Sequence, residues 1–346
     1  MKSRKAILIL ENGIRFTGTA FGYLKDVVGE VVFSTSMTGY QETITDPSYC
    51  GQIVIFTYPL VGNYGTNLED KEGEKPSLSA IVVREKCDYP NNFRTEMDLD
   101  GYLKQNKVLG LEGIDTRALT KIIRNAGCMR GIITTDESIS EEEIKSRLEG
   151  YDPSDVVKTV STSKKYEIEG EGKKVALIDM GTKLGIINKL KERNCNIAVF
   201  PYDASLEDII DFNPDVVLVS DGPGSPLDVP ETIETVKGLM GRYPLRGICM
   251  GQLVIGLALD GTVKKLKFGH HGSSQPVKNV KSGEVLVTPQ NHNYVIDKLS
   301  DELEVTYVNV NDGSYEGVEG KTLDVKAVQF YPEAYSKKDI FDDLLA

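Results

Sequence analysis

The chain has 346 residues, of which 40 are Lys or Arg and 52 are Asp or Glu, and its formal net charge is -12. This length suits two domains, each large enough to bury its own core. The negative charge argues against nucleic-acid binding as the main function. Since no apolar run approaches the roughly 18 residues of a membrane span, we expect a cytoplasmic protein that does not associate with a membrane.

The five cysteines are widely scattered, and none forms a Cys-x-x-Cys pair. They therefore indicate neither a disulfide framework nor a zinc site. Four of them, Cys50, Cys87, Cys128 and Cys195, are expected to fill space as small apolar side chains. Only Cys249 has a sequence context that suggests chemistry.

Residues 1–150 predict a mixed, β-rich domain. The segment "AILILENGIRFTGTAFG" has two apolar runs around an Asn-Gly turn, which is typical of a hairpin, and "GEVVFSTS" and "GQIVIFTYP" favour further strands. The segment "GIDTRALTKIIRNAG" predicts a helix capped by Asp115 or Thr116 and ended by Gly127. A second, acidic helix is expected in "SISEEEIKSRLEGY", with Ser138 or Ser140 as its cap.

Residues 151–173 are polar, charged and glycine-containing, so we interpret them as a linker. Residues 174–346 begin with strands that alternate with helical segments; the strands include "KVALIDMG", "CNIAVFPYD", "DVVLVSDGPGSP" and "LRGICMG". This alternation predicts an α/β domain with a mainly parallel sheet covered by helices on both faces. Such sheets bind ligands at the carboxyl ends of their strands, where "SDGPGSP" and "GICMGQ" place two glycine-rich turns.

The stretch "GICMG", residues 247–251, matches the pattern of a nucleophile held in a sharp turn between a strand and a helix. The flanking glycines avoid collisions in the turn, and the helix N-terminus favours thiolate over thiol at Cys249. The backbone N–H of Met250 would point to a developing oxyanion. The alternative is a buried structural cysteine in a glycine-rich turn.

The motifs "GPGSP", "GICMG", "PQNHN" and "QFYPEA" resemble those of class I, triad-type glutamine amidotransferases in order and spacing. The segments "STSMTGYQETITDPSYCGQIVIFTYPLVGNYGTN", "FGHHGSSQPVKN" and "IDTRALT" narrow the resemblance to the small, glutamine-hydrolysing subunit of carbamoyl-phosphate synthase. The resemblance covers essentially the whole chain. It implies a small-subunit domain at 1–150 and a class I glutamine amidotransferase domain at 174–346.

The resemblance implies that the chain hydrolyses glutamine to glutamate and ammonia. The ammonia would pass to a large subunit, the partner in a heterodimer, which uses bicarbonate and ATP with Mg to make carbamoyl phosphate for pyrimidines and arginine. No cofactor is expected on this chain itself. No metal site is expected either, because no carboxylate or cysteine stands at ligand spacing from His270 and His271.

Site residues follow from the resemblance by position. Cys249 would be the nucleophile, Glu333 would orient the catalytic base, and the backbone N–H groups of Gly224 and Met250 would form the oxyanion hole. The residues expected to hold glutamine are Ser48, Gly222, Gly224, Met250, Asn291, Asn293, Tyr294 and Leu253.

The sequence departs from the family pattern within this site. Tyr331 stands where the family has its catalytic histidine, Leu253 replaces a substrate-binding glutamine, Asn293 replaces a glycine and Tyr294 a phenylalanine. Tyrosine, with a pKa of about 10, is protonated at neutral pH and makes a poor base. Gln252 lies one position too early on the helix to replace the missing glutamine, since its side chain points about 100° away.

Two functional hypotheses therefore remain open. Either the chain is a glutaminase subunit with impaired activity, or it is a catalytically inactive structural or regulatory subunit of a synthase that uses free ammonia. His292, which adjoins Asn291, is a candidate substitute base in the first case.

Overall fold

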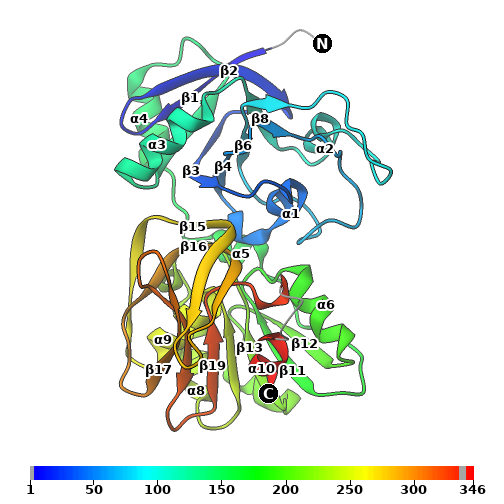
Figure 1. Ribbon diagram of the computed structural model, residues 1–346, viewed down its shortest axis with the longest axis vertical. Coiled ribbons are helices and arrows are strands. Elements are labelled where there is room, and N and C mark those ends of the chain that lie inside the picture. Colours follow the sequence, from blue (N-terminus) through cyan, green and yellow to red (C-terminus); the bar gives the residue numbers. More distant parts are fainter. Residues whose placement is uncertain (1–3, 335–339) are drawn as a thin grey trace. The chain divides into compact units, whose positions relative to one another are not determined.

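The computed structural model describes residues 4–334 and 340–346 (Figure 1). The chain forms two compact units, residues 1–153 and 154–346. The second unit begins at residue 154 and so includes most of the segment expected to be a linker.

The first unit is built around a closed β-barrel, with its strands in the order β1-β2-β8-β6-β4-β3-β9. Its strands are β1 (Arg4–Leu10), β2 (Arg15–Gly22), β3 (Val27–Ser34), β4 (Gln52–Phe56), β6 (Ala80–Val82), β8 (Leu109–Glu112) and β9 (Met129–Thr134), with the short pair β5 (Leu60–Val61) and β7 (Glu85–Lys86) beside them. The β-rich character predicted for this domain is confirmed.

The helices of this unit are α1 (Tyr40–Thr45), α2 (Leu99–Gln105), α3 (Thr116–Ala126) and α4 (Glu141–Glu149), with a 3₁₀ turn, η1 (Pro47–Tyr49). The predicted caps are in place: the Asp115 carboxylate accepts the Ala118 N–H, and the Ser140 hydroxyl accepts the Glu143 N–H. The predicted first hairpin is also present, and its Gly13 has a φ of 85°, which glycine adopts without strain.

The second unit holds a sheet of ten strands within the described residues. Its centre is parallel, in the order β12 (Asn196–Pro201), β11 (Lys174–Asp179), β13 (Val216–Val219), β14 (Leu245–Ile248) and β19 (Val325–Val328). The parallel sheet predicted from the strand–helix alternation is therefore confirmed for this central part.

Antiparallel strands extend that sheet beyond what the sequence predicted. Next to β19 lie, in order, β18 (Tyr315–Gly320), β17 (Leu303–Asn309) and the long hairpin of β15 (Thr262–Asn279) and β16 (Val285–Lys298). These strands follow one another through turns without a crossover helix, so they pair antiparallel.

The segment 151–173, expected to be a linker, contributes structure to the second unit. It contains the helix α5 (Val156–Val160) and the edge strand β10 (Tyr166–Ile168), which pairs antiparallel with β12. Its polar composition suits an exposed edge, where one side of the strand meets solvent and charged residues discourage further pairing.

Helices cover both faces of the parallel strands, as predicted. On one face α7 (Leu206–Phe212), α8 (Pro230–Leu239) and α9 (Met250–Ala258) pack against alternate strand residues such as Ile178 and Val217. On the other face α6 (Leu184–Glu192) and α10 (Ile340–Leu345) pack against the intervening residues, such as Leu177 and Leu218.

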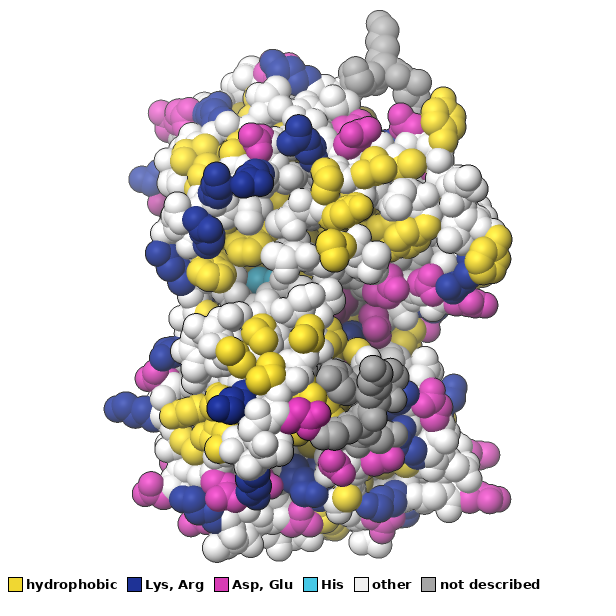
Figure 2. Space-filling view, in the orientation of Figure 1, with side chains coloured by type: hydrophobic (Ala, Val, Ile, Leu, Met, Phe, Trp, Pro, Cys, Tyr) yellow, Lys and Arg dark blue, Asp and Glu magenta, His cyan; other side chains and the backbone are white. Residues whose placement is uncertain are grey.

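Among the described residues, no helix combines the length and the apolar character that crossing a membrane requires. Acidic and basic side chains are interspersed over the face drawn in Figure 2.

Candidate active site

The candidate site is centred on Cys249, at the sharp turn between β14 and α9. Cys249 has φ 53° and ψ -104°, a conformation that costs energy for a residue with a side chain. Its N–H donates to the Val328 carbonyl oxygen at 2.8 Å, and its carbonyl accepts the Gln252 N–H at 3.1 Å. The strained turn predicted from "GICMG" is thus present, with the cysteine directly before the first helical residue.

Glycine is required on both sides of this turn. A Cβ on Gly251 would lie 2.1 Å from the Val219 carbonyl oxygen, and one on Gly247 would lie 2.8 Å from the backbone of Gly251. The turn is therefore pressed against the end of β13. That strand end continues into the second glycine-rich turn, where Gly222 packs on Met180 and Gly224 has a φ of 82°.

The sulfur of Cys249 is buried and has two identified polar neighbours. The thiol donates to the Asn291 carbonyl oxygen at 3.6 Å, and the sulfur accepts the Gln329 side-chain N–H, also at 3.6 Å. The Tyr331 hydroxyl donates to the same Asn291 oxygen at 3.4 Å. Cys249 and Tyr331 thus converge on one carbonyl oxygen, and in this arrangement both are hydrogen-bond donors.

Glu333 lies in the 3₁₀ turn η3 (Pro332–Ala334), where it forms a buried ion pair. The Lys183 ammonium is 3.0 Å from its carboxylate oxygen Oε1, and both side chains are less than a tenth exposed. The same ammonium lies 3.9 Å from the centre of the Tyr331 ring, in a cation–π contact. Sequence reasoning missed Lys183, because a buried lysine is rare and nothing in "MGTKLG" marks it.

Strand β16 presents Asn291 and Asn293 through contacts with one histidine. The His271 ring nitrogens lie 2.5 Å from the Asn291 side-chain oxygen and 3.0 Å from that of Asn293. Tyr294, the third predicted substrate contact on this strand, packs against the core that includes α9. Three predicted residues, Asn291, Asn293 and Tyr294, thus lie on the part of β16 whose Asn291 carbonyl oxygen accepts the Cys249 thiol.

Leu253 and Ser48 are two further predicted positions. The Leu253 side chain packs into the hydrophobic core beneath α9, with only 2 % of the residue exposed. Ser48 lies in the first unit, within η1, where its hydroxyl donates to the Asp46 carboxylate at 2.5 Å. Gln252 points away from Leu253, as expected from the helix geometry, and is fully buried.

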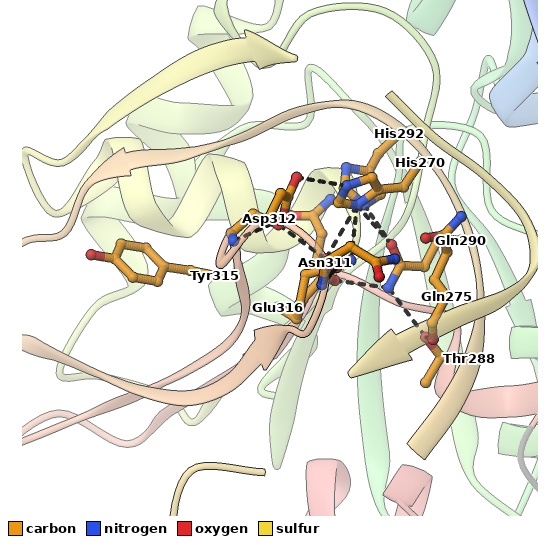
Figure 3. Close-up of polar contacts among 12 residues, drawn as sticks. His270, Gln275, Thr288, Gln290, His292, Asn311, Asp312, Tyr315 and Glu316 are labelled. Carbon is orange, nitrogen blue, oxygen red and sulfur yellow. Dashed lines mark hydrogen bonds and ion pairs between the residues drawn. The ribbon is translucent and has the colours of Figure 1, made fainter. Parts of the chain in front are cut away.

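On the other face of β16, Gln290 and His292 belong to a buried polar network with His270 and Glu316 (Figure 3). His270 Nε2 is 3.0 Å from the Asp312 carboxylate, and its Nδ1 is 3.3 Å from the Glu316 carboxylate. Both ring nitrogens of His270 therefore lie beside carboxylate oxygens, whose negative charge favours the protonated ring. Burial alone would lower the pKa of His270, but the hydrogen bonds and charges of Glu316 and Asp312 outweigh it and raise that pKa.

Among the residues that the structure describes, His270, His292 and Glu316 offer ligand atoms within 4.8 Å of one another and form a candidate group for a metal. However, the Gln290 side-chain oxygen lies between the rings, 3.0 Å from His270 Nδ1 and 3.1 Å from His292 Nε2. A metal would have to displace this oxygen. We therefore interpret the group as a hydrogen-bonded network.

His292 was a candidate substitute base, but its ring nitrogens are directed elsewhere. Nδ1 contacts the Tyr294 carbonyl oxygen at 2.9 Å, and Nε2 contacts Gln290. Burial, followed by the charge of His270, lowers the pKa of His292 well below its usual value. This geometry does not support His292 as the base for Cys249.

The raised pKa of His270 predicts a pH-dependent contribution to stability. That contribution should be fully present below the unfolded-state pKa of about 6.5 and lost as pH rises through the higher folded-state pKa. We expect His270→Asn to lower the free energy of unfolding, measured with urea, more at pH 6 than above the folded-state pKa. Each unit of pKa shift corresponds to about 1.4 kcal/mol.

His271→Asn is the control for this measurement, because that ring faces amide oxygens and not carboxylates. The change that His271→Asn causes in the free energy of unfolding should not decrease with rising pH in the way expected for His270→Asn. If the difference in the free energy of unfolding between the wild-type chain and His270→Asn stayed constant with pH, this would contradict a raised pKa of His270.

Comparisons with known proteins identify the families of the two parts of the chain. Residues 176–343 match the family described as "Glutamine amidotransferase class-I", and residues 8–133 match "Carbamoyl-phosphate synthase small chain, CPSase domain". The second unit is therefore a class I glutamine amidotransferase domain with its cysteine at the strand–helix turn.

Similar proteins extend the match to the whole chain. The chain is 54% identical over 345 residues to the carbamoyl phosphate synthase small chain of Clostridium perfringens, covering 99% of each protein. It is 46% identical over 331 residues to the pyrimidine-specific small chain of Bacillus subtilis, covering 95% of this chain and 91% of that one. The protein belongs to the carbamoyl-phosphate synthase small-chain family.

A solved structure described as a glutamine amidotransferase from Thermotoga maritima is a more distant likeness. It has 16% sequence identity and a TM-score of 0.39, over 47% of this chain and 77% of that one.

Proposed function

We propose that this chain hydrolyses glutamine to glutamate and ammonia at Cys249, with a rate limited by the tyrosine at position 331. The observation that carries the proposal is the Cys249 turn, which holds a thiol at a helix N-terminus beside a second glycine-rich turn. The helix N-terminus favours the thiolate, and the N–H groups of Met250 and Gly224 are candidates to stabilise the oxyanion.

The proposed reaction proceeds through a thioester. The Cys249 thiolate attacks the glutamine side-chain carbonyl, the C–N bond breaks, and ammonia leaves after taking up a proton. Water then cleaves the thioester to give glutamate and the free thiol. Both steps need a group that accepts and returns a proton, which a neutral imidazole does well and a phenol does poorly at neutral pH.

The proposed partner is a large subunit that receives the ammonia and makes carbamoyl phosphate, with ATP and Mg bound to that subunit. The names of the similar small chains support this assembly. Whether the product serves pyrimidine or arginine synthesis, the chemistry at Cys249 is the same.

A second candidate is an inactive subunit that supports a synthase using free ammonia. The favouring observation is that the Tyr331 hydroxyl and the Cys249 thiol both donate to the Asn291 carbonyl. Leu253 also favours the inactive subunit, because an apolar side chain packed in the core stands where the family has a substrate-binding glutamine.

Labelling with a chloroketone analogue of glutamine separates the two candidates. A thiolate displaces chloride and forms a thioether, which mass spectrometry locates. The proposal predicts labelling of Cys249 that excess glutamine slows, with Cys50 and Cys195 serving as buried internal controls. An intact chain that is not labelled at Cys249 would favour the inactive subunit.

A further inference from the structure

Two fully buried glutamine side chains form a line of hydrogen bonds that ends at the Cys249 sulfur. Gln252 lies in the first turn of α9, and Gln329 directly follows β19. Gln252 Nε2 is 3.1 Å from Gln329 Oε1, and Gln329 Nε2 is 3.6 Å from the sulfur.

A backbone carbonyl fixes the direction of both amides. Gln252 Nε2 also lies 3.1 Å from the Tyr315 carbonyl oxygen, which can only accept a hydrogen bond. Turning the Gln252 amide around would place its oxygen against this carbonyl and against Gln329 Oε1. The amide nitrogen of Gln252 therefore faces Gln329, and the Gln329 amide must direct its own N–H at Cys249.

Strand β18 holds both glutamines in position. The Gln329 backbone N–H donates to the Glu316 carbonyl oxygen at 2.8 Å, which ties it to β18. Tyr315, whose carbonyl orients Gln252, is adjacent to Glu316 in the same strand. The His270 ring contacts the Glu316 side chain, so the network of Figure 3 holds the strand that sets both amides.

An N–H directed at sulfur stabilises the thiolate more than the thiol, because a hydrogen bond to a charged acceptor is the stronger one. We propose that Gln329 is a catalytic residue that stabilises the Cys249 thiolate through its side-chain N–H, and that Gln252 is the positioning residue that fixes the direction of that N–H. When the thiol ionises, its proton passes to solvent. This inference deepens the proposed function and rests on Cys249 being its nucleophile.

The test is a pH titration of the Cys249 thiolate in the full chain, without glutamine. The ultraviolet absorbance of the thiolate is followed against pH, and the same titration with Cys249→Ser in each background is subtracted. The variants are Gln329→Met, Gln252→Met and their double. Gln52→Met, which removes a buried glutamine of the first unit, is the matched control.

Gln329→Met should raise the titration midpoint by about one pH unit, the size expected for losing one hydrogen bond to a charged group. Gln252→Met should raise it in the wild-type background and leave it unchanged in the Gln329→Met background, because it acts only through Gln329. Gln52→Met should leave it unchanged.

Two results would overturn the proposal: a midpoint unchanged in Gln329→Met, or equal shifts from Gln252→Met in both backgrounds. If Gln329→Met does not fold, the titration of Gln252→Met is the test. An unchanged midpoint of the Cys249 thiolate in that variant then overturns the proposal. Because no glutamine is used, an absence of glutamine turnover would count against the proposed function and not against this inference.

Discussion

Tyr331→His should raise the rate of glutamine hydrolysis by roughly 10²–10⁴-fold, the usual contribution of a general base. The Tyr331 hydroxyl reaches the same Asn291 carbonyl oxygen as the Cys249 thiol, so an imidazole at this position lies on the correct side of the sulfur. Glu333, two residues further on, is the carboxylate expected to orient it. The measurement is glutamate release as a function of pH.

The pH profile of this variant carries a second expectation. The rate should rise as the imidazole loses its proton, because only the neutral ring accepts the proton of Cys249. The Lys183 ammonium beside position 331 lowers the pKa of an imidazole there and the Glu333 carboxylate raises it, so the midpoint should lie near the ordinary value of about 6.5.

Tyr331→Phe is the matched control, since it keeps the ring over Lys183 and removes the hydroxyl. Because a phenol is a poor base, we expect Tyr331→Phe to retain the wild-type rate within a few-fold. A loss as large as that of Cys249→Ser would instead show that the tyrosine hydroxyl takes part in the reaction.

Lys183→Met should destabilise the second unit by roughly 3–5 kcal/mol, the usual cost of breaking a buried ion pair from one side. The variant removes the ammonium 3.0 Å from the Glu333 carboxylate and leaves that charge in a site that is 4 % exposed. It also removes the cation from the face of the Tyr331 ring. Urea unfolding followed by circular dichroism measures the loss.

Lys183→Met combined with Glu333→Gln removes both charges and is the control for this prediction. Replacing both members of a buried pair is usually close to neutral, so the double variant should recover most of the stability lost in Lys183→Met. A double variant as unstable as the single one would show that Lys183 stabilises the fold by packing and not by neutralising Glu333.

Local features of the fold could be predicted from the sequence. The capped helix α3, the first hairpin and the Cys249 turn each depend on residues that are neighbours in the chain, so short patterns identify them. The antiparallel extension of the second sheet could not be predicted in this way. Its register depends on pairing between segments such as β15 and β17, which the local pattern does not encode.

In the candidate site, too, residues recognised from local patterns differ from those that depend on contacts between distant parts of the chain. The Cys249 turn follows from glycine spacing at a strand end, and Gly222 and Gly224 were assigned from the family resemblance. The buried pair of Lys183 and Glu333, in contrast, joins residues 150 positions apart. The helix geometry correctly predicted that Gln252 points away from Leu253. Its partners, Tyr315 in β18 and Gln329 directly after β19, are distant in the chain, so identifying them needed the structure.

The most direct test of the account is glutamate release from glutamine by the chain in complex with its large subunit. The wild-type chain, Cys249→Ser and Tyr331→His would be measured side by side. The account predicts slow release by the wild-type chain, none above background by Cys249→Ser, and at least about a hundred-fold faster release by Tyr331→His. A wild-type rate that Tyr331→His does not improve would contradict it, since the chain would then already possess a working base.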